Sequence, residues 1–264
     1  MTSPNNINNT ELLETQIKKM GFRSLEGDGL SDFLQTARKN KWSHRQVISE
    51  FVKMELQERE HRSLQWRMRD SKIQNFKPIA DYDWNWPKRI DRAQIEKLVD
   101  ADFVTNAENV VLVGTPGLGK TMIAKNIIHN AVYKGHTALF ISSAEMLTDL
   151  SKQDSARLLE KRIRHYCKPG MLCIDEIGYL SYDQQAADFL YQIISRRYEQ
   201  KSTVITTNLV FSDWPTVFPG ASSVASLIDR LIHHSEISLI EGESYREKEA
   251  KKKKAQRQKN RGKK

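Results

Sequence analysis

Two patterns of hydrophobic positions divide the chain. Up to about residue 75, apolar side chains recur every three or four positions, as at Leu13, Ile17 and Met20, and this spacing predicts amphipathic helices. Beyond that point, short apolar runs rich in β-branched residues alternate with helical segments, as in βαβ units. The pattern therefore predicts a small all-helical domain followed by an α/β domain with a parallel sheet.

The helical domain contains three predicted helices, at residues 10–22, 30–40 and 43–70. Ser43 and Gln46 have the spacing of a capping box, in which each side chain satisfies a free backbone N–H group at the start of the third helix. The second half of that helix is mostly charged, so it is either solvated or in contact with a protein or DNA partner. Residues 1–9 are rich in asparagine and are expected to be disordered.

The segment 76–94 separates the two domains, because Pro78 and Pro87 interrupt helices there. Tyr82, Trp84 and Trp86 alternate along it, as side chains packed on the next domain would, and the alternative is that one of them lines an adenine pocket. The strands expected after it are 109–113, 137–142, 170–175, 202–208 and 236–241. The predicted division is a disordered start at 1–9, a helical domain at 10–75, an α/β domain at 76–246 and a flexible basic tail at 247–264.

Positive charge is concentrated outside the α/β domain. The whole chain carries a formal net charge of +9, and residues 247–264 hold ten Lys or Arg against two Glu. Residues 36–77 hold eleven basic and five acidic residues, whereas residues 78–246 hold 18 basic and 21 acidic ones. This distribution is typical of binding to nucleic acid through its phosphates, and a merely solvated tail is the alternative.

Targeting signals and paired cysteines are not evident. No apolar run reaches the roughly 18 residues of a membrane span, and the first residues lack the basic and apolar regions of a secretion signal. Cys167 and Cys173 lack CxxC spacing and are expected to be ordinary residues in or near the core. These features predict a cytoplasmic protein without membrane contact.

Residues 114–122 read GTPGLGKTM and match the P-loop pattern at every fixed position. In such a loop, backbone N–H groups surround phosphate oxygens, the lysine reaches the β- and γ-phosphates, and the threonine hydroxyl binds Mg²⁺. An apolar strand precedes the loop and a helical segment follows it, which is the context that the motif requires. The sequence therefore predicts a site for ATP and Mg²⁺ made by Gly114, Thr115, Pro116, Gly117, Leu118, Gly119, Lys120, Thr121 and Met122.

A second set of residues is expected to support hydrolysis of the bound ATP. About fifty-five residues after the P-loop, an apolar strand ends in Asp175 and Glu176. Asp175 is expected in the Mg²⁺ shell beside Thr121, and Glu176 is placed to hold and polarise a water for attack on the γ-phosphate. Asn208, at the end of another predicted strand, either orients that water or caps a turn.

Arginines are candidates for the last catalytic element, because an arginine from a neighbouring subunit stabilises the transition state in many such proteins. Arg196, Arg197 and Arg230 are the candidates. Spacing alone prefers none of them, since each ends a helix before a strand, where arginine also complements the helix dipole.

The segments GTPGLGKT, MLCIDEIGYL, ISRRYEQKSTVITTNL, LIDRLIHHS and GESYR together resemble those of the IstB-type ATPases. These are transposition helper proteins of one insertion-sequence family and relatives of the DnaC-type helicase loaders, and both groups are AAA+ P-loop proteins. The resemblance covers residues 76–246 densely. It implies an AAA+ core with a five-stranded parallel sheet, in the order 5-1-4-3-2, flanked by helices.

The resemblance also implies roles for individual residues. Asn208 matches the sensor-1 position, Arg230 matches the arginine-finger segment and is preferred to Arg197, and Arg246 falls where a sensor-2-like or tail-anchoring arginine contacts ATP. The expected catalytic residues are then Lys120, Asp175, Glu176, Asn208 and Arg230, with Thr121 and Asp175 as metal ligands.

Two basic groups are candidates for DNA contact. Arg157, Lys161 and Arg164 share one helix face, which in an AAA+ assembly can approach central DNA, and a solvated amphipathic face is the alternative. The tail is richer in lysine than the family pattern requires, at Lys251, Lys252, Lys253 and Lys254.

The function that the resemblance implies is that of an ATP-dependent, DNA-binding helper of transposition. It would form a homo-oligomer on double-stranded DNA with ATP between subunits and recruit or activate a cognate transposase, and hydrolysis would reset the assembly. A replicative helicase loader would use the same ATPase residues, and a nucleotide-gated DNA-binding adaptor would show negligible turnover. A small-molecule kinase fits less well, because no lid or nucleoside-binding segment is visible.

Overall fold

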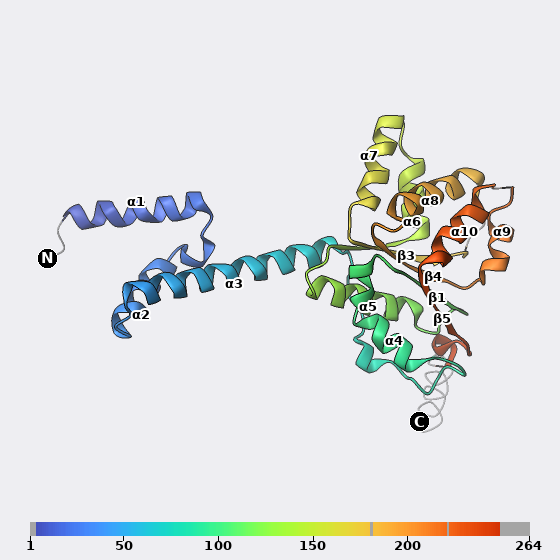
Figure 1. Cartoon of the computed structure of the whole chain (residues 1–264), viewed down its shortest axis with the longest axis horizontal. Helices are drawn as coiled ribbons and strands as arrows, with labels where there is room; N and C mark the ends of the chain where they lie inside the picture. The colour runs from blue at the N-terminus through green and yellow to red at the C-terminus, as the bar shows by residue number, and fades with distance from the viewer. Residues whose placement is uncertain (1–3, 180–181, 221, 249–264) are drawn as a thin grey trace, which may run out of the picture. The chain divides into compact units, whose positions relative to one another are not determined.

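The computed structural model describes residues 4–179, 182–220 and 222–248, with side chains from Glu11 onward (Figure 1). The chain divides into two compact units, Met1–Trp66 and Arg67–Lys264. The division falls inside the long helix α3 (His44–Asp70), which therefore contributes to both units.

The first unit is helical. It contains α1 (Pro4–Met20), the short helix η1 (Arg23–Leu25), α2 (Gly29–Lys39) and most of α3. Its small core is formed by Ile17, Leu25 and Leu30, with Phe22, Phe33, Phe51 and Met54 packed against them. Helix α1 begins at Pro4, a residue that suits the first turn of a helix.

The capping box predicted for α3 is present. Gln46 Oε1 accepts the backbone N–H of Ser43 at 2.8 Å, and Ser43 Oγ accepts the N–H of Gln46 at 3.4 Å. The helix accordingly begins at His44, one residue after the cap.

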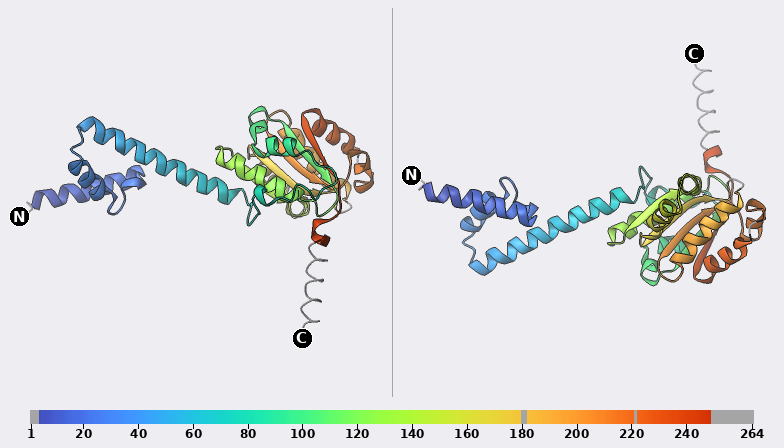
Figure 2. Two further views of the ribbon diagram at one scale, coloured as in Figure 1. Left: turned by 90° about the horizontal axis from the view of Figure 1, so that it is seen from below. Right: turned by 90° about the horizontal axis from the view of Figure 1, so that it is seen from above.

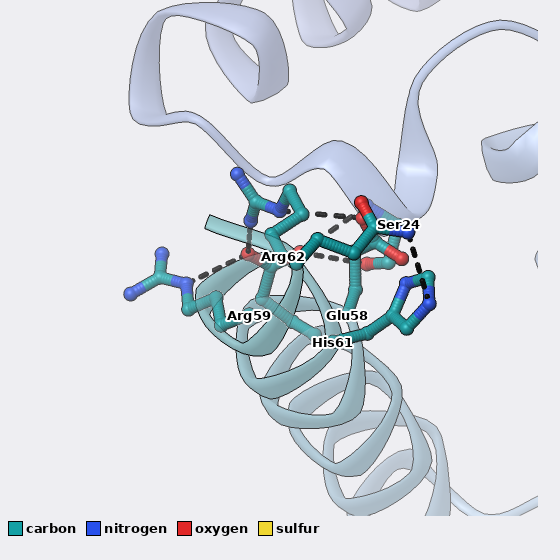
Figure 3. Close-up of polar contacts among 7 residues, drawn as sticks. Ser24, Glu58, Arg59, His61 and Arg62 are labelled. Atoms are coloured by element: carbon teal, nitrogen blue, oxygen red, sulfur yellow. Dashed lines mark hydrogen bonds and ion pairs between the residues drawn. The ribbon is translucent and has the colours of Figure 1, made fainter. Parts of the chain in front are cut away.

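A buried carboxylate ties α3 to η1 within this unit, and its partners Ser24, Arg59 and Arg62 lie together in Figure 3. Glu55 is only 5% exposed; its Oε2 accepts the N–H and hydroxyl of Ser24 at 3.2 and 2.9 Å, and its Oε1 accepts Arg59 Nε at 2.7 Å. Arg62 adds a contact of 3.4 Å to the same oxygen. Burial by itself raises the pKa of Glu55, but the hydrogen bonds from Arg59 and Ser24 bring it below the usual value.

The second unit is built on a parallel sheet. Its strands, among the described residues, are β1 (Asn109–Gly114), β2 (Ala138–Ser142), β3 (Met171–Ile177), β4 (Ser202–Thr207) and β5 (Ser235–Ile240). They lie in the order β2-β3-β4-β1-β5, with every neighbouring pair parallel. This confirms the predicted fold and strand order. The central strands β1 and β4 are buried at every position, which is why they appear in the sequence as continuous apolar or small-residue runs.

Helices cover both faces of the sheet (Figure 2). One face packs against α5 (Lys120–Tyr133), which in turn contacts α4 (Arg92–Val99). The opposite face holds an extensive hydrophobic cluster and is covered by α6 (Ser143–Ser151), α7 (Ala156–Cys167), α8 (Gln184–Arg197), α9 (Trp214–Val217) and α10 (Ser223–His233). Short helical turns η2 (Ile79–Asp81), η3 (Asp102–Asn106) and η4 (Phe211–Asp213) complete the connections.

Because all the strands are parallel, their carboxyl ends meet at one edge of the sheet. That edge carries the P-loop after β1, the acidic pair at the end of β3, and Asn208 just after β4. Open α/β sheets bind ligands at this edge. In the part of the chain that the structure describes, no helix is long and apolar enough to cross a membrane.

Candidate active site

The P-loop connects β1 directly to α5. Gly117 and Gly119 have φ angles of 82° and 86°, in the left-handed region that glycine tolerates. A Cβ on Gly119 would lie 2.6 Å from Cε2 of Tyr82, and one on Gly117 would overlap the hydroxyl of Ser244. Both glycines are thus required by backbone conformation and by the close approach of neighbouring segments.

Lys120 is the first residue of α5, and its ammonium lies inside the loop. Its Nζ donates hydrogen bonds to the carbonyl oxygens of Gly114 at 2.6 Å and Thr115 at 2.9 Å. Burial lowers the pKa of this ammonium, whereas the nearby carboxylates of Asp175 and Glu176 act in the opposite direction. The loop therefore holds a positive charge where phosphate groups would bind.

Thr121 and Asp175 face each other across the sheet edge. The Thr121 hydroxyl lies 3.2 and 3.1 Å from the two carboxylate oxygens of Asp175, which is 5% exposed. Burial raises the pKa of Asp175, opposed by hydrogen bonds from Thr206 and Thr121 and by the charge of Lys120. A carboxylate and a hydroxyl that converge beside a phosphate cradle are the oxygen donors that Mg²⁺ prefers, so these residues fit that ion.

Glu176 and Asn208 lie at the same cavity. The side chain of Glu176 is exposed, unlike that of Asp175 before it. Oδ1 of Asn208 is buried and has no hydrogen-bond partner among the described residues. A buried amide oxygen with no partner suits a bound water or ligand.

A cavity of about 420 Å³ joins these groups, which is within the size range of small-molecule sites. Residues 116–121 of the P-loop line it together with Glu176 and Asn208. Aromatic residues also line it, among them Phe76, Tyr82, Trp86 and Tyr245. Tyr82 and Trp86 thus line the cavity, while Trp84 packs against the Tyr82 ring at 4.7 Å between centroids.

The segment after β5 returns to cover the P-loop. The backbone N–H of Tyr245 donates to the carbonyl of Gly117 at 3.0 Å, and Thr115 Oγ1 donates to the carbonyl of Gly242 at 3.1 Å. Arg246 is exposed and lines the cavity. The contacts between this segment and the loop join residues more than a hundred positions apart, so no local sequence pattern predicts them.

The three candidate arginines have different environments. Arg197 is 1% exposed, and its guanidinium donates to Thr203 Oγ1 and to several backbone carbonyls, including those of Pro169 and Ser202. Arg230 is half-buried and does not line its own chain's cavity; its guanidinium donates to Ser195 Oγ and lies 4.9 Å from the centroid of the Tyr191 ring. Arg197 is therefore enclosed by its own fold, whereas Arg230 lies away from its own nucleotide cavity.

Arg196 forms a two-pronged ion pair with Glu160 of α7, with N···O distances of 2.9 and 2.8 Å. Arg196 and Arg164 hold the pKa of Glu160 down, at about 2.

The basic residues expected to contact DNA are only partly described. Arg157, Lys161 and Arg164 are exposed on α7 and line a shallow hollow on the surface. Arg164 also donates to Glu160 at 2.7 Å. Lys251, Lys252, Lys253 and Lys254 lie outside the described residues.

Thr206 is a site residue that sequence reasoning missed. Its Oγ1 donates to Asp175 Oδ1 at 2.5 Å and accepts the backbone N–H of Glu176 at 2.9 Å. The signal was present, since Thr206 lies two positions before Asn208 and side chains two apart share one side of a strand. Without the pairing of β3 with β4, however, nothing indicated which residues it would meet.

One further group of potential metal ligands lies outside the cavity, formed by Glu199, His233 and His234. All three are exposed. His234 Nε2 lies 3.1 Å from Glu199 Oε1, and His233 Nδ1 lies 2.7 Å from the hydroxyl of Tyr198. One polar atom of each residue thus has a protein partner, and the group is a hydrogen-bonded cluster at the ends of α8 and α10.

The fold and the site define a P-loop protein of the AAA+ type, with the strand order and the P-loop position that this class requires. Comparison with solved structures supports the fold. A DnaI crystal structure matches with a TM-score of 0.52 at 19% identity, covering 66% of this chain and 92% of that one. The replication initiator DnaA bound to AMPPCP and single-stranded DNA matches with a TM-score of 0.50 at 14% identity, covering 62% and 52%.

Within that class the chain belongs to the family of IstB-like ATP binding proteins, which it matches over residues 15–255. The ATP-binding protein of insertion sequence IS5376 from Geobacillus stearothermophilus is 34% identical over 78% of this chain and 82% of its own length. That of IS21 from Pseudomonas aeruginosa is 32% identical over 84% of both chains. That of IS232 from Bacillus thuringiensis is 30% identical over 92% of this chain and 96% of its own. The predicted family is thereby confirmed.

Proposed function

We propose that this protein is an ATPase that assists the transposition of an insertion sequence. It binds ATP and Mg²⁺, forms oligomers on double-stranded DNA, and recruits or activates the cognate transposase. The observation that carries the proposal is the convergence of Lys120, Thr121, Glu176 and Asn208 on one cavity, with Asp175 bonded to Thr121, in a chain whose relatives are insertion-sequence ATP-binding proteins.

Binding begins at the P-loop. Its backbone N–H groups and the N-terminus of α5 attract the phosphates, and Lys120 exchanges the carbonyls of Gly114 and Thr115 for phosphate oxygens. Thr121 and Asp175 hold Mg²⁺, which when bound neutralises phosphate charge. The aromatic residues in the lining, Tyr82, Trp86 and Tyr245 among them, supply apolar and stacking surface for the base.

Hydrolysis then depends on the placement of a water molecule. Glu176 accepts its proton, and the unpaired Oδ1 of Asn208 fixes its orientation for in-line attack. Arg230 acts on the neighbouring subunit's nucleotide, because it is not among the residues that line its own cavity, while Arg197 is enclosed by its own chain. Turnover would therefore require assembly, and this would link the oligomer to the state of the nucleotide.

The test measures ATP turnover, duplex-DNA binding and particle size with ATP, with ADP and without nucleotide. Wild type is compared with Lys120→Ala, Glu176→Gln and the surface control Lys134→Ala. We expect large DNA-bound assemblies only with ATP, none with Lys120→Ala, and long-lived assemblies with Glu176→Gln that turn over at least roughly 100-fold more slowly. Size and DNA affinity that do not respond to ATP would contradict the proposal.

The partner and the DNA contacts have separate tests. Pull-down experiments with the cognate transposase and with the replicative helicase distinguish a transposition helper from a helicase loader. Binding of the helicase alone would contradict this proposal. Replacing Arg157, Lys161 and Arg164 by alanine should weaken DNA binding and flatten its dependence on salt, by roughly one unit of log–log slope per lost phosphate contact. Deleting residues 249–264 measures the contribution of the tail in the same way.

A further inference from the structure

The backbone of Glu176 is held in a costly conformation. Its φ is 63°, in the left-handed region that a residue other than glycine adopts only at a cost in free energy. At the same place, the register of β3 against β4 shifts between Ile174 and Ile177, so Asp175 and Glu176 form an irregularity in the strand. Such a geometry persists only where its surroundings enforce it, so the contacts of this bulge identify what orients the two carboxylates.

Thr206 contacts both acidic residues from the adjacent strand. It is fully buried, its hydroxyl donates to Asp175 Oδ1 at 2.5 Å, and the same oxygen accepts the N–H of Glu176 at 2.9 Å. The single hydroxyl proton is thus committed to the carboxylate, and a lone pair is committed to the amide. One side chain therefore fixes the carboxylate of Asp175 and the backbone of Glu176 together.

Buried hydroxyls hold the other side of the Glu176 residue. Ser143 Oγ donates to the Glu176 carbonyl at 3.0 Å and lies 2.9 Å from the hydroxyl of Tyr182. A carbonyl can only accept, so the Ser143 proton points to Glu176, and Tyr182 must donate to Ser143. The Tyr182 oxygen in turn accepts the N–H of Gly178 at 3.3 Å. Both polar backbone groups of Glu176 are thus bonded to hydroxyls of buried residues.

We propose that Thr206 is a positioning residue for ATP hydrolysis, and that Ser143, held by Tyr182, supports the same bulge from the opposite side. This inference rests on the proposed function. The hydroxyl of Thr206 keeps Asp175 directed at Thr121 and keeps Glu176 in the left-handed conformation that directs its carboxylate to the cavity. Without that hydroxyl, Glu176 relaxes toward ordinary strand geometry, and its carboxylate moves away from the attacking water.

Asn208 directly follows the end of β4, two residues after Thr206. Strand β4 therefore orients three of the groups that would surround the attacking water. It orients Asp175 and Glu176 through Thr206, and it positions Asn208 as the next residue along the chain. Ser143 is the first residue of α6, so the end of β2 is joined to the same point.

The experiment compares Thr206→Val, which keeps the size of the side chain but removes both hydrogen bonds, with Thr206→Ser, which keeps the hydroxyl. Full-length protein is assayed for kcat and KM of ATP hydrolysis with DNA, for equilibrium binding of a fluorescent ATP analogue, and for thermal unfolding. Ser202→Ala is the matched control, because Ser202 is a fully buried residue of β4 whose hydroxyl has no partner among the described residues.

We expect Thr206→Val to lower kcat by roughly 10- to 100-fold while nucleotide affinity stays within about threefold of wild type. Thr206→Ser should recover most of kcat, and Ser202→Ala should match wild type. A Thr206→Val enzyme with wild-type kcat overturns the positioning role, as does an equal loss of kcat, affinity and thermal stability in the valine and serine variants.

Two further outcomes are decisive. A wild-type protein without ATP turnover overturns the proposed function and this role with it, whereas wild-type turnover unaffected by Thr206→Val overturns this role alone. Should Thr206→Val fail to fold, Ser143→Ala tests the same bulge from its other side. That variant should lower kcat with nucleotide affinity preserved, and an unchanged kcat would refute the proposal.

Discussion

The phenol of Tyr82 donates a hydrogen bond of 2.7 Å to the backbone carbonyl of Leu118, and its ring edge lies directly against Gly119. Tyr82 comes from the linker before the sheet, so the nucleotide loop is held from outside the β1–α5 unit that carries its motif. Burial raises the pKa of Tyr82 to about 12. We therefore expect substitutions at Tyr82 or Gly119 to disturb the loop.

The first prediction concerns the space beside the loop. Gly119→Ala should destabilise the fold by about 1–3 kcal/mol, because its φ of 86° is strained for alanine, and should also weaken ATP binding, since the new Cβ displaces Tyr82. Urea unfolding and binding of a fluorescent ATP analogue measure the two effects. Gly135→Ala is the control, with a φ of 97° but no atom within 4 Å of the new Cβ. It should lose stability and retain binding; equal affinity in the two variants would contradict the steric argument.

The second prediction is a dependence on alkaline pH. The folded-state pKa of Tyr82, about 12, lies above the ordinary value of 10.0, so the folded protein keeps a proton that the unfolded chain loses. The stability contributed by this phenol is full below about pH 10 and is lost as pH rises toward 12. Urea unfolding at pH 9 to 11 should therefore show wild type losing its advantage over Tyr82→Phe as pH rises. Tyr166 is present in both proteins and cancels from the difference. A gap that stays constant with pH would disprove the assignment.

The third prediction separates a structural arginine from a catalytic one. Arg197→Ala should lower the free energy of unfolding by more than about 3 kcal/mol, because several buried carbonyls lose their donor and each unpaired group costs about 1–3 kcal/mol. Arg196→Ala, which removes an ion pair near the surface, should have a much smaller effect. Denaturant titration measures both. An Arg197→Ala protein of wild-type stability but without turnover would instead favour a catalytic role for Arg197.

The fourth prediction concerns the helical unit. Glu55→Gln removes the charge that Arg59 and Ser24 stabilise, and should lower the melting temperature by roughly 2–4 °C at pH 7. Since the folded-state pKa of Glu55 lies below its usual value of 4.5, this stability is present above that pH and is lost as pH falls through the folded-state pKa. The gap between wild type and variant should thus close in acid. Glu50→Gln is the control, because the Glu50 side chain is 43% exposed and pairs with Lys53 near the surface.

The sequence alone predicts much of the candidate nucleotide site, because each of its motifs lies within a short stretch of the chain. The P-loop lies on consecutive residues, and the acidic pair directly follows an apolar run, so strand, turn and helix signals bracket each motif. The role of Thr206 could not be predicted in this way. Its role depends on which strand lies beside β3, and the hydrogen bonds that define it join residues about thirty positions apart in the chain.

The sequence by itself determined the helical and α/β units, the capping box at Ser43 and the position of the phosphate loop, because each follows from residue spacing within one element. Only the tertiary structure decided that Arg197 is enclosed, that Tyr82 and Ser244 cover the loop glycines, and that Thr206 joins the carboxylate of Asp175 to the backbone N–H of Glu176. These relationships arise when parallel strands bring their carboxyl ends to one edge of the sheet. A pattern of neighbouring residues carries no information about which distant segments of the chain will be in contact after folding.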